Sequence, residues 1–249
     1  MLKPTVLPPI RYDRPAAEPG RSLHSTSLPQ SMSQFSTAPS VRIGVVAGNA
    51  VAVLCVAYAI VLSIGLLTLP SRELPIQNPW FTVMELLILG IAPAMVGLAV
   101  GIHCWAPIDR KPHALLSIIF MSMCALVTCC VHFAVLTLSR HPTFATGSWP
   151  TLVFAFNWPS VVYALDILAW DVFFPLAALF AALAIRGGGL RGLARSLLFA
   201  SAALAFAGLA GVPLANMNVR NIGIIGYVLV YPIAALLLSI VFRSEAASE

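Results

Sequence analysis

The chain has 249 residues, of which 59% are apolar and only 9% are charged. Ordinary soluble domains carry about 25% charged residues, so this composition excludes a water-soluble globule. Lysine and arginine outnumber aspartate and glutamate by 14 to 9, which gives a formal net charge of +5. In so apolar a chain we interpret this excess as a signal of membrane topology, and we expect membrane lipids, and no nucleic acid, as partners.

Residues 1–42 differ in composition from everything that follows. They contain seven prolines, seven serines and five scattered basic residues, with no sustained apolar period. This composition predicts a disordered tail. The first apolar run begins at Ile43 and is 27 residues long. A signal-peptide core has about 7 to 15 apolar residues, so we do not expect a cleaved signal peptide.

Six apolar stretches follow the tail, each long enough to cross a hydrocarbon core of about 30 Å as a helix. They are 43–69, 80–105, 114–138, 159–185, 196–215 and 222–242. Because backbone groups in lipid must be hydrogen-bonded internally, the spans must be helical. We therefore predict an all-α membrane bundle of six transmembrane helices over 43–243, followed by a short C-terminal tail, 244–249. We find no internal repeat, because proline and acid positions in the two three-helix halves do not coincide.

Small residues at helical spacing indicate where helices approach one another closely. The second span has Gly97 and Gly101, and the fifth has Ala203, Ala207 and Gly211. We expect both sets to pack inside the bundle rather than to form a dimer interface.

The basic residues predict the orientation of the bundle. The tail, the loops at 106–113 and 186–195, and the C-terminus together hold eleven lysines and arginines, whereas the three opposite loops hold only Arg72, Arg140 and Arg220. Positively charged loops are retained in the cytoplasm. We therefore expect both termini to be cytoplasmic, in the inner membrane of a bacterium.

The cysteines and histidines form no recognisable metal or haem motif. The five cysteines show no Cys-x-x-Cys or Cys/His ligand spacing. Only His132 lies deep within a predicted span, so a pair of axial histidines for haem is lacking. We expect no cofactor and no metal, and the sequence leaves the oligomeric state open.

Ionisable residues within the spans are the strongest functional signal. A charge at a helix centre costs about 2.5 to 3.5 kcal/mol on the insertion scale, so such groups should face the interior. The predicted topology places Glu85, His132 and Asp166 in the outer half of the membrane and Asp171 nearer the midplane. None of these acids has a predicted lysine or arginine partner within a span.

The neighbours of these groups complete the predicted site. Tyr163 shares a helix face with Asp166, whereas Asp171 is turned about 140° away from Asp166 on an ideal helix. Pro175 lacks an N–H, so it removes the helical partner of the Asp171 carbonyl and bends the fourth span. Tyr227 and Tyr231 form an i, i+4 pair on the sixth span, and Arg220 is expected just outside that span.

These residues favour a small-molecule or proton-coupled transporter, with the outer polar site binding a proton or a small ligand. The first alternative is a structural or accessory membrane protein that binds a partner through its helices, with Glu85, His132 and Asp166 serving only to join helices. The second is a membrane-embedded lipid-modifying enzyme, in which an acid and His132 would transfer protons. No catalytic motif is present, so we expect the chain not to be an enzyme.

Two segments carry a family resemblance. The run WPSVVYALDILAWDVFFPLAALFAALAI from Trp158 to Ile185, with the later NVRNIGIIGYVLVYP, resembles uncharacterised bacterial six-span integral membrane proteins. The resemblance covers about the last 90 residues. It implies the six-span fold and no particular activity.

Overall fold

A computed structural model describes residues 38–71, 74 and 76–247 of the chain. The predicted disordered tail lies outside these residues except for 38–42, which already belong to the first helix. The described residues are all-helical and contain no strand. The helices belong to one unit, Ser36–Glu249.

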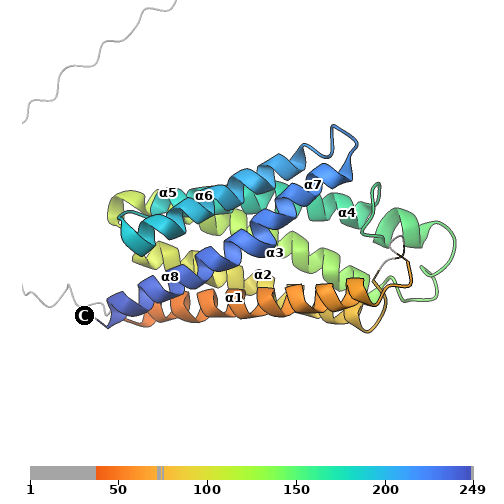
Figure 1. The fold of residues 1–249 in the computed structure, drawn as a ribbon, viewed down its shortest axis with the longest axis horizontal. Helices are drawn as coiled ribbons and strands as arrows, with labels where there is room; N and C mark the ends of the chain where they lie inside the picture. The colour runs from red at the N-terminus through yellow and green to blue at the C-terminus, as the bar shows by residue number, and fades with distance from the viewer. Residues whose placement is uncertain (1–37, 72–73, 75, 248–249) are drawn as a thin grey trace, which may run out of the picture. The chain divides into compact units, whose positions relative to one another are not determined.

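Figure 1 shows the helices packed side by side, with their long axes roughly along the same direction. Besides α-helices, the described residues form one 3-10 helix, η2, and three π-helices, η3, η4 and η5. The elements are α1 (Ala38–Leu67), α2 (Trp80–Trp105), η2 (Ile108–Arg110), α3 (Lys111–Thr137), η3 (Pro150–Phe154), α4 (Val161–Ile167), η4 (Leu168–Phe173), α5 (Phe174–Ala184), α6 (Gly189–Leu209), α7 (Met217–Ile224), η5 (Ile225–Val230) and α8 (Tyr231–Ala246).

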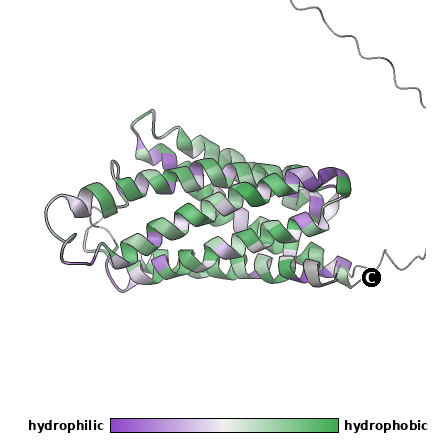
Figure 2. Ribbon diagram, turned by 180° about the vertical axis from the view of Figure 1, so that it is seen from behind, coloured by the Kyte–Doolittle hydropathy of each residue, from purple (hydrophilic) through white to green (hydrophobic). Residues whose placement is uncertain are grey.

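Six continuous helical segments are long and apolar enough to cross a membrane, as the sequence predicts. They are Val41–Leu67, Trp80–Trp105, Ile108–Thr137, Val161–Ala184, Gly189–Leu209 and Met217–Ala246, with mean hydropathies between 1.6 and 2.7. Figure 2 shows apolar residues along the length of the helices and hydrophilic residues mainly toward their ends. Within the described part of the chain, the fold is compatible with a multi-pass membrane protein.

The predicted bounds of the fifth span are wrong. The sequence placed this span at 196–215, but α6 begins at Gly189, directly after the glycine break, and ends at Leu209. Arg191 and Arg195 therefore lie in the helix rather than in a loop. Arg191 pairs with Glu245 of α8 at 2.5 Å, and its guanidinium lies 5.6 Å from the ring centre of Trp105 of α2. Basic side chains near a helix end can thus be used in packing between helices.

The six spans form a closed ring in sequence order. Each span contacts the next, and α1 contacts α8, which closes the ring. In the most apolar stretch of each span, the share of buried residues is 39%, 61% and 44% for the second, fourth and sixth spans. For the first, third and fifth spans it is only 22%, 33% and 33%. The even-numbered spans therefore supply most of the interior of the bundle.

The closest contacts between helices are made at small residues. Only some of the small residues predicted to pack inside the bundle are among them. A Cβ on Gly101 would lie 2.4 Å from the Cα of Gly44, so α1 and α2 touch through their backbones there, as predicted for the second span. The prediction for Ala203 and Ala207 is wrong, because both are exposed on α6. The contact face of α6 is turned from them and includes Gly208, and α7 packs against Gly208 and against Gly211 in the turn that follows α6.

The fourth and sixth spans are both interrupted by a π-helix directly before a proline. In the fourth span the N–H of Phe174, which precedes Pro175, donates to the carbonyl of Ala169, five residues back. In the sixth span the N–H of Tyr231, which precedes Pro232, donates to the carbonyl of Gly226, again five residues back. These wide turns connect α4 to α5 and α7 to α8.

Candidate functional site

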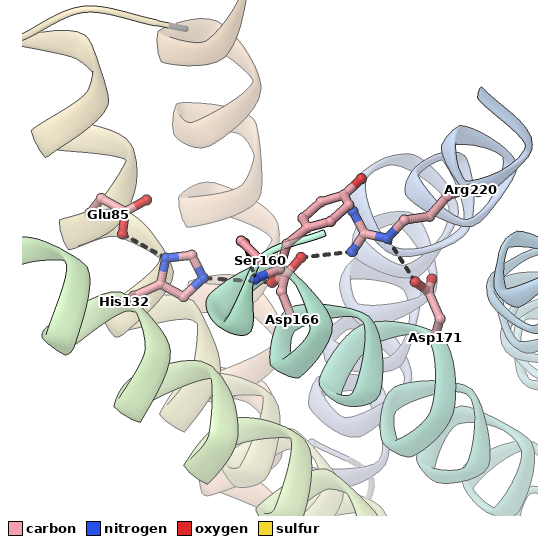
Figure 3. A network of polar contacts seen from close by, with 7 residues as sticks. Glu85, His132, Ser160, Asp166, Asp171 and Arg220 are labelled. Carbon is pink, nitrogen blue, oxygen red and sulfur yellow. Dashed lines mark hydrogen bonds and ion pairs between the residues drawn. The ribbon is translucent and has the colours of Figure 1, made fainter. Parts of the chain in front are cut away.

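Five ionisable side chains meet near one end of the bundle (Figure 3). Glu85 is the sixth residue of α2, His132 the sixth residue from the end of α3, Asp166 the sixth of α4 and Arg220 the fourth of α7. Because α3 runs opposite to the other three helices, these positions fall at similar heights. Asp171 joins them from η4, one turn further in.

Local capping fixes the starts of the two helices that carry the charged pair. The Ser160 hydroxyl accepts a hydrogen bond from the N–H of Tyr163 at 3.2 Å, which caps α4. The Asn216 side chain accepts from the N–H of Asn218 at 3.1 Å, which caps α7. Serine and asparagine are favoured at such positions because they satisfy otherwise unpaired N–H groups.

The first part of the network joins α2 to α3. The Nδ1 atom of His132 lies 2.8 Å from a carboxylate oxygen of Glu85, and both side chains are almost fully buried. The imidazole also stacks on the ring of Phe156, with 5.2 Å between ring centres. His132 is therefore held in one orientation, with its Nε2 atom directed toward α4.

The second part joins α4 and η4 to α7. Arg220 donates from Nη2 to Asp166 at 2.7 Å and from Nε to Asp171 at 2.9 Å. Its guanidinium also lies 4.6 Å from the ring centre of Tyr163. Arg220 and Asp171 are 4% and 0% exposed, so this ion pair is shielded from the surroundings of the bundle.

This geometry corrects the predicted place of Arg220 and the predicted lack of a cationic partner. The asparagines around Arg220 predict a loop. In the structure, however, Asn218 and Asn221 lie within α7, and only Asn216 lies outside it, as its N-terminal cap. Arg220 is thus inside the sixth span. Asp166 and Asp171 share it as a common partner.

The predicted divergence of the two aspartates is also wrong. A regular α-helix turns about 100° per residue, which separates positions five apart by about 140°. In a π-helix each hydrogen bond reaches five residues back, so residues five apart lie closer to the same face. The wide turn that begins at Leu168 brings Asp166 and Asp171 onto one guanidinium.

The tyrosines of the predicted site fall in two environments. Tyr163 contacts Arg220 directly. Tyr227 and Tyr231 instead pack in an aromatic cluster: Tyr227 lies 5.0 Å from Trp170, and Tyr231 lies 5.0 Å from Phe174, between ring centres. The structure therefore adds Trp170 and Phe174 to the neighbourhood of the site.

The two parts of the network meet at a gap. The Nε2 atom of His132 lies 3.8 Å from a carboxylate oxygen of Asp166, which is too long for a hydrogen bond. That Nε2 atom and the Oδ1 atom of Asp171 are buried and have no hydrogen-bond partner in the described part of the protein. Within the network, His132 Nε2 and Asp171 Oδ1 can therefore each still form a hydrogen bond.

The surroundings of the network are apolar. A cavity of about 310 Å³ lies between α3, the loop at η3 and α4, with Cys130, Ala134, Trp149 and Val162 among its lining residues. Over the described residues, no cluster of three or more histidine, cysteine, aspartate or glutamate side chains is arranged to hold a metal ion.

Comparison with known proteins adds no identification. No protein-family model, no curated protein and no solved structure matches this chain. The chemistry of the site must therefore carry the functional argument.

Proposed function

We propose that the chain is a multi-pass membrane protein that binds protons at this network and couples their binding to the movement of a small solute. One observation carries the proposal: the buried carboxylates of Glu85 and Asp171 and the partly buried carboxylate of Asp166 lie around one guanidinium and one imidazole. Glu85, Asp166 and Asp171 supply three negative charges when ionised, whereas Arg220 and a doubly protonated His132 supply two positive charges.

The charge imbalance makes proton binding favourable. A buried charge without a partner is costly, and the cost is larger in a low-dielectric interior than in water. One proton on any of the three acids removes the imbalance. If His132 is singly protonated, a second proton is required. Among the described residues, the other ionisable groups around the network are the phenols of Tyr58 on α1, Tyr163 on α4 and Tyr227 on η5, and the thiol of Cys124 on α3. None of them adds a positive charge.

The same proposal assigns an orientation. Arg42, Arg110, Lys111, Arg186, Arg191, Arg195 and Arg243 gather at the end of the bundle opposite the network. Because positively charged ends are retained in the cytoplasm, both termini are cytoplasmic in this proposal and the network lies nearer the outer face of a bacterial inner membrane. Membrane lipids and a small solute are the partners proposed.

A structural role is the second candidate. It is favoured by Arg220, whose two ion pairs join α4 and η4 to α7 as a purely mechanical link would. In that role the network would stay in one protonation state. A lipid-modifying role is the third candidate. It is favoured by the apolar cavity between α3, the loop at η3 and α4, and release of a labelled product from phospholipid would reveal it.

Infrared difference spectroscopy on the protein in nanodiscs tests the proposal, because a protonated carboxyl has a C=O band that a carboxylate lacks. We expect such a band to change between about pH 5 and 8, the range in which histidine-linked networks titrate. Glu85→Gln or Asp171→Asn should remove or shift the band. The matched control is Asp109→Asn, at the opposite end of the bundle, which should leave it unchanged. A spectrum without a titrating carboxyl band in the folded protein would favour the structural role.

A further inference from the structure

We infer that the outer segments of the fourth and sixth spans, α4 with η4 and α7 with η5, move as one unit about a pair of matched hinges. The fourth span carries Trp-Asp-Val-Phe-Phe-Pro-Leu-Ala-Ala-Leu over 170–179, and the sixth carries Tyr-Val-Leu-Val-Tyr-Pro-Ile-Ala-Ala-Leu over 227–236. Both have an aromatic residue five positions before the proline, an aromatic residue directly before it, and Ala-Ala-Leu after it. The two spans run in the same direction through the ring.

The shared motif weakens both helices at the same level. Proline has no N–H to donate and its ring crowds the preceding turn, so it bends a helix. In both spans the residue before the proline makes the last long-reach hydrogen bond of a π-helix. π-helical turns are uncommon and less regular than α-helical turns, and they occur frequently at functional sites.

The hinges pack against each other. The ring of Phe174, directly before Pro175, lies 5.0 Å from the ring of Tyr231, directly before Pro232, at an angle of 77°. Both side chains are buried, at 0% and 3% exposure. An edge-to-face contact between the two hinge residues provides a common pivot that keeps the bends aligned.

On the outer side of the pivot the two spans are firmly joined. Arg220 of α7 bonds Asp166 of α4 and Asp171 of η4, and Trp170 of η4 packs against Tyr227 of η5. These contacts make the outer segments one unit.

That unit packs against α3, but its polar contact with the pair Glu85 and His132 is weak. Glu85 and His132 lie on α2 and α3, which contain no π-helix. Among the described residues, the polar contact between this pair and the moving unit is the 3.8 Å approach of His132 Nε2 to Asp166. Asp166 lies eight residues before Phe174, a lever of about 12 Å, so a rotation of roughly 5° moves it by about 1 Å. Such a shift closes the gap to hydrogen-bond distance or opens it further.

The hinge therefore controls whether His132 and Asp166 can exchange a proton, and in this respect it rests on the proposed proton-binding function. In the closed position the proton leaves Nε2 of His132 and binds the Asp166 carboxylate. In the open position the pair is separated. The charge of the network favours one position or the other. That charge is set by Glu85, His132, Asp166, Asp171 and Arg220, next to the phenols of Tyr58, Tyr163 and Tyr227 and the thiol of Cys124.

Distance measurements between spin labels test this inference. The outer pair is Leu138→Cys, at the end of α3, with Asn221→Cys on α7; the inner pair is Ile119→Cys on α3 with Ile233→Cys on α8. All four positions are exposed, and the five native cysteines are replaced beforehand. We expect the outer distance to change between about pH 5 and 8 while the inner distance stays constant. Pro175→Ala with Pro232→Ala should suppress the change, because each alanine restores an N–H donor.

The outcomes separate this inference from the proposed function. An outer distance that is constant at every pH in the parent protein overturns the hinge, whether or not the proline variants fold. If the infrared carboxyl band titrates while that distance stays constant, proton binding stands and the hinge fails. If the distance changes without a titrating carboxyl band, the hinge stands, but its control by the network fails.

Discussion

Arg220 shows how much depends on one residue. Its guanidinium is shared by the buried Asp171 and the partly buried Asp166, both on the fourth span, and its aromatic neighbour Tyr163 covers one face. Removing one member of a buried ion pair leaves an unpaired charge, which costs about 3 to 5 kcal/mol. Arg220 therefore contributes to stability and to the charge of the network at once.

We expect Arg220→Gln to destabilise the protein strongly, by about 3 to 5 kcal/mol, because both aspartates lose their charged partner. Adding Asp171→Asn should restore part of the loss, since it removes one of the unpaired charges. Arg186→Gln is the control, because Arg186 pairs with Asp109 at a half-exposed site, where such pairs contribute about 0 to 1 kcal/mol. Unfolding in lipid bicelles measures all three. Equal losses for Arg220→Gln and Arg186→Gln would contradict this account.

We expect Glu85→Gln to abolish proton uptake while the protein still folds. Glu85→Gln keeps an amide oxygen in reach of His132 but cannot take up or release a proton. We expect the variant to fold with a stability loss of about 1 to 2 kcal/mol. Proton uptake by proteoliposomes, followed with an enclosed pH indicator, should fall to the level of protein-free liposomes. Wild-type uptake in this variant would remove Glu85 from the site.

At the scale of the elements, glycines let α6 and α7 approach closely enough to place Arg220. A Cβ on Gly208 would lie 2.9 Å from the Cα of Gly223, and one on Gly211 would lie 2.9 Å from the backbone nitrogen of Arg220. A Cβ on Gly223 itself would lie 2.8 Å from Oδ1 of Asp171. The small residues of α6 and α7 thus define the space for the ion pair.

Gly223→Ala should therefore disturb the network as well as the packing. We expect a loss of about 1 to 3 kcal/mol, typical of overpacking, together with a shifted infrared carboxyl band. Gly90→Ala on α2 is the matched control, because its Cβ would meet only Leu54 at an ordinary 3.5 Å. Since alanine favours helix over glycine, that control should be neutral or stabilising by up to about 1 kcal/mol. If Gly223→Ala left both the stability and the carboxyl band unchanged, the close packing of α7 would not be needed to position the ion pair.

The sequence predicted the spans better than the interior geometry. Hydropathy and length were sufficient to find the six spans, although not the bounds of the fifth, and Glu85 does meet His132. Arg220 was predicted as a site residue but placed outside the sixth span, because neighbouring asparagines resemble a loop, although Arg220, Gly223 and Tyr227 recur at helical spacing. The π-helices were missed because periodicity analysis assumes 3.6 residues per turn. The motif shared by the fourth and sixth spans was missed because only inverted halves were compared.

At the scale of the whole molecule, charge is distributed unevenly between the ends of the ring. The basic end also contains paired groups: Arg186 bonds Asp109 at 2.7 Å, and Arg110 bonds the carbonyl of Leu183 at 3.3 Å. At the opposite end, in the described residues, Arg140 lies beside Thr82 and Asn78 and has no acidic partner. The difference between the two ends is the basis for the proposed orientation.

A reporter fused after Glu249 should be active in the cytoplasm, and a tag inserted at Thr146 should be accessible from outside intact cells. Thr146 is exposed in the loop between α3 and η3, so a short tag should not disturb the bundle. A second reporter after Gly188, between α5 and α6, should agree with the one at Glu249. An external C-terminus would reverse the orientation and place the network nearer the cytoplasm.

The contact that closes the ring has a consequence for biosynthesis. The face of α1 that includes Gly48 and Asn49 is completed by α8, through the backbone of Ala235 and a 3.0 Å hydrogen bond from Ser239. The ribosome makes α8 after α1, so this face of α1 stays uncovered in the membrane until α8 has been made. A chain truncated before Met217 never covers it. We expect such truncated chains to be captured by insertases or degraded by membrane proteases, whereas full-length chains escape both.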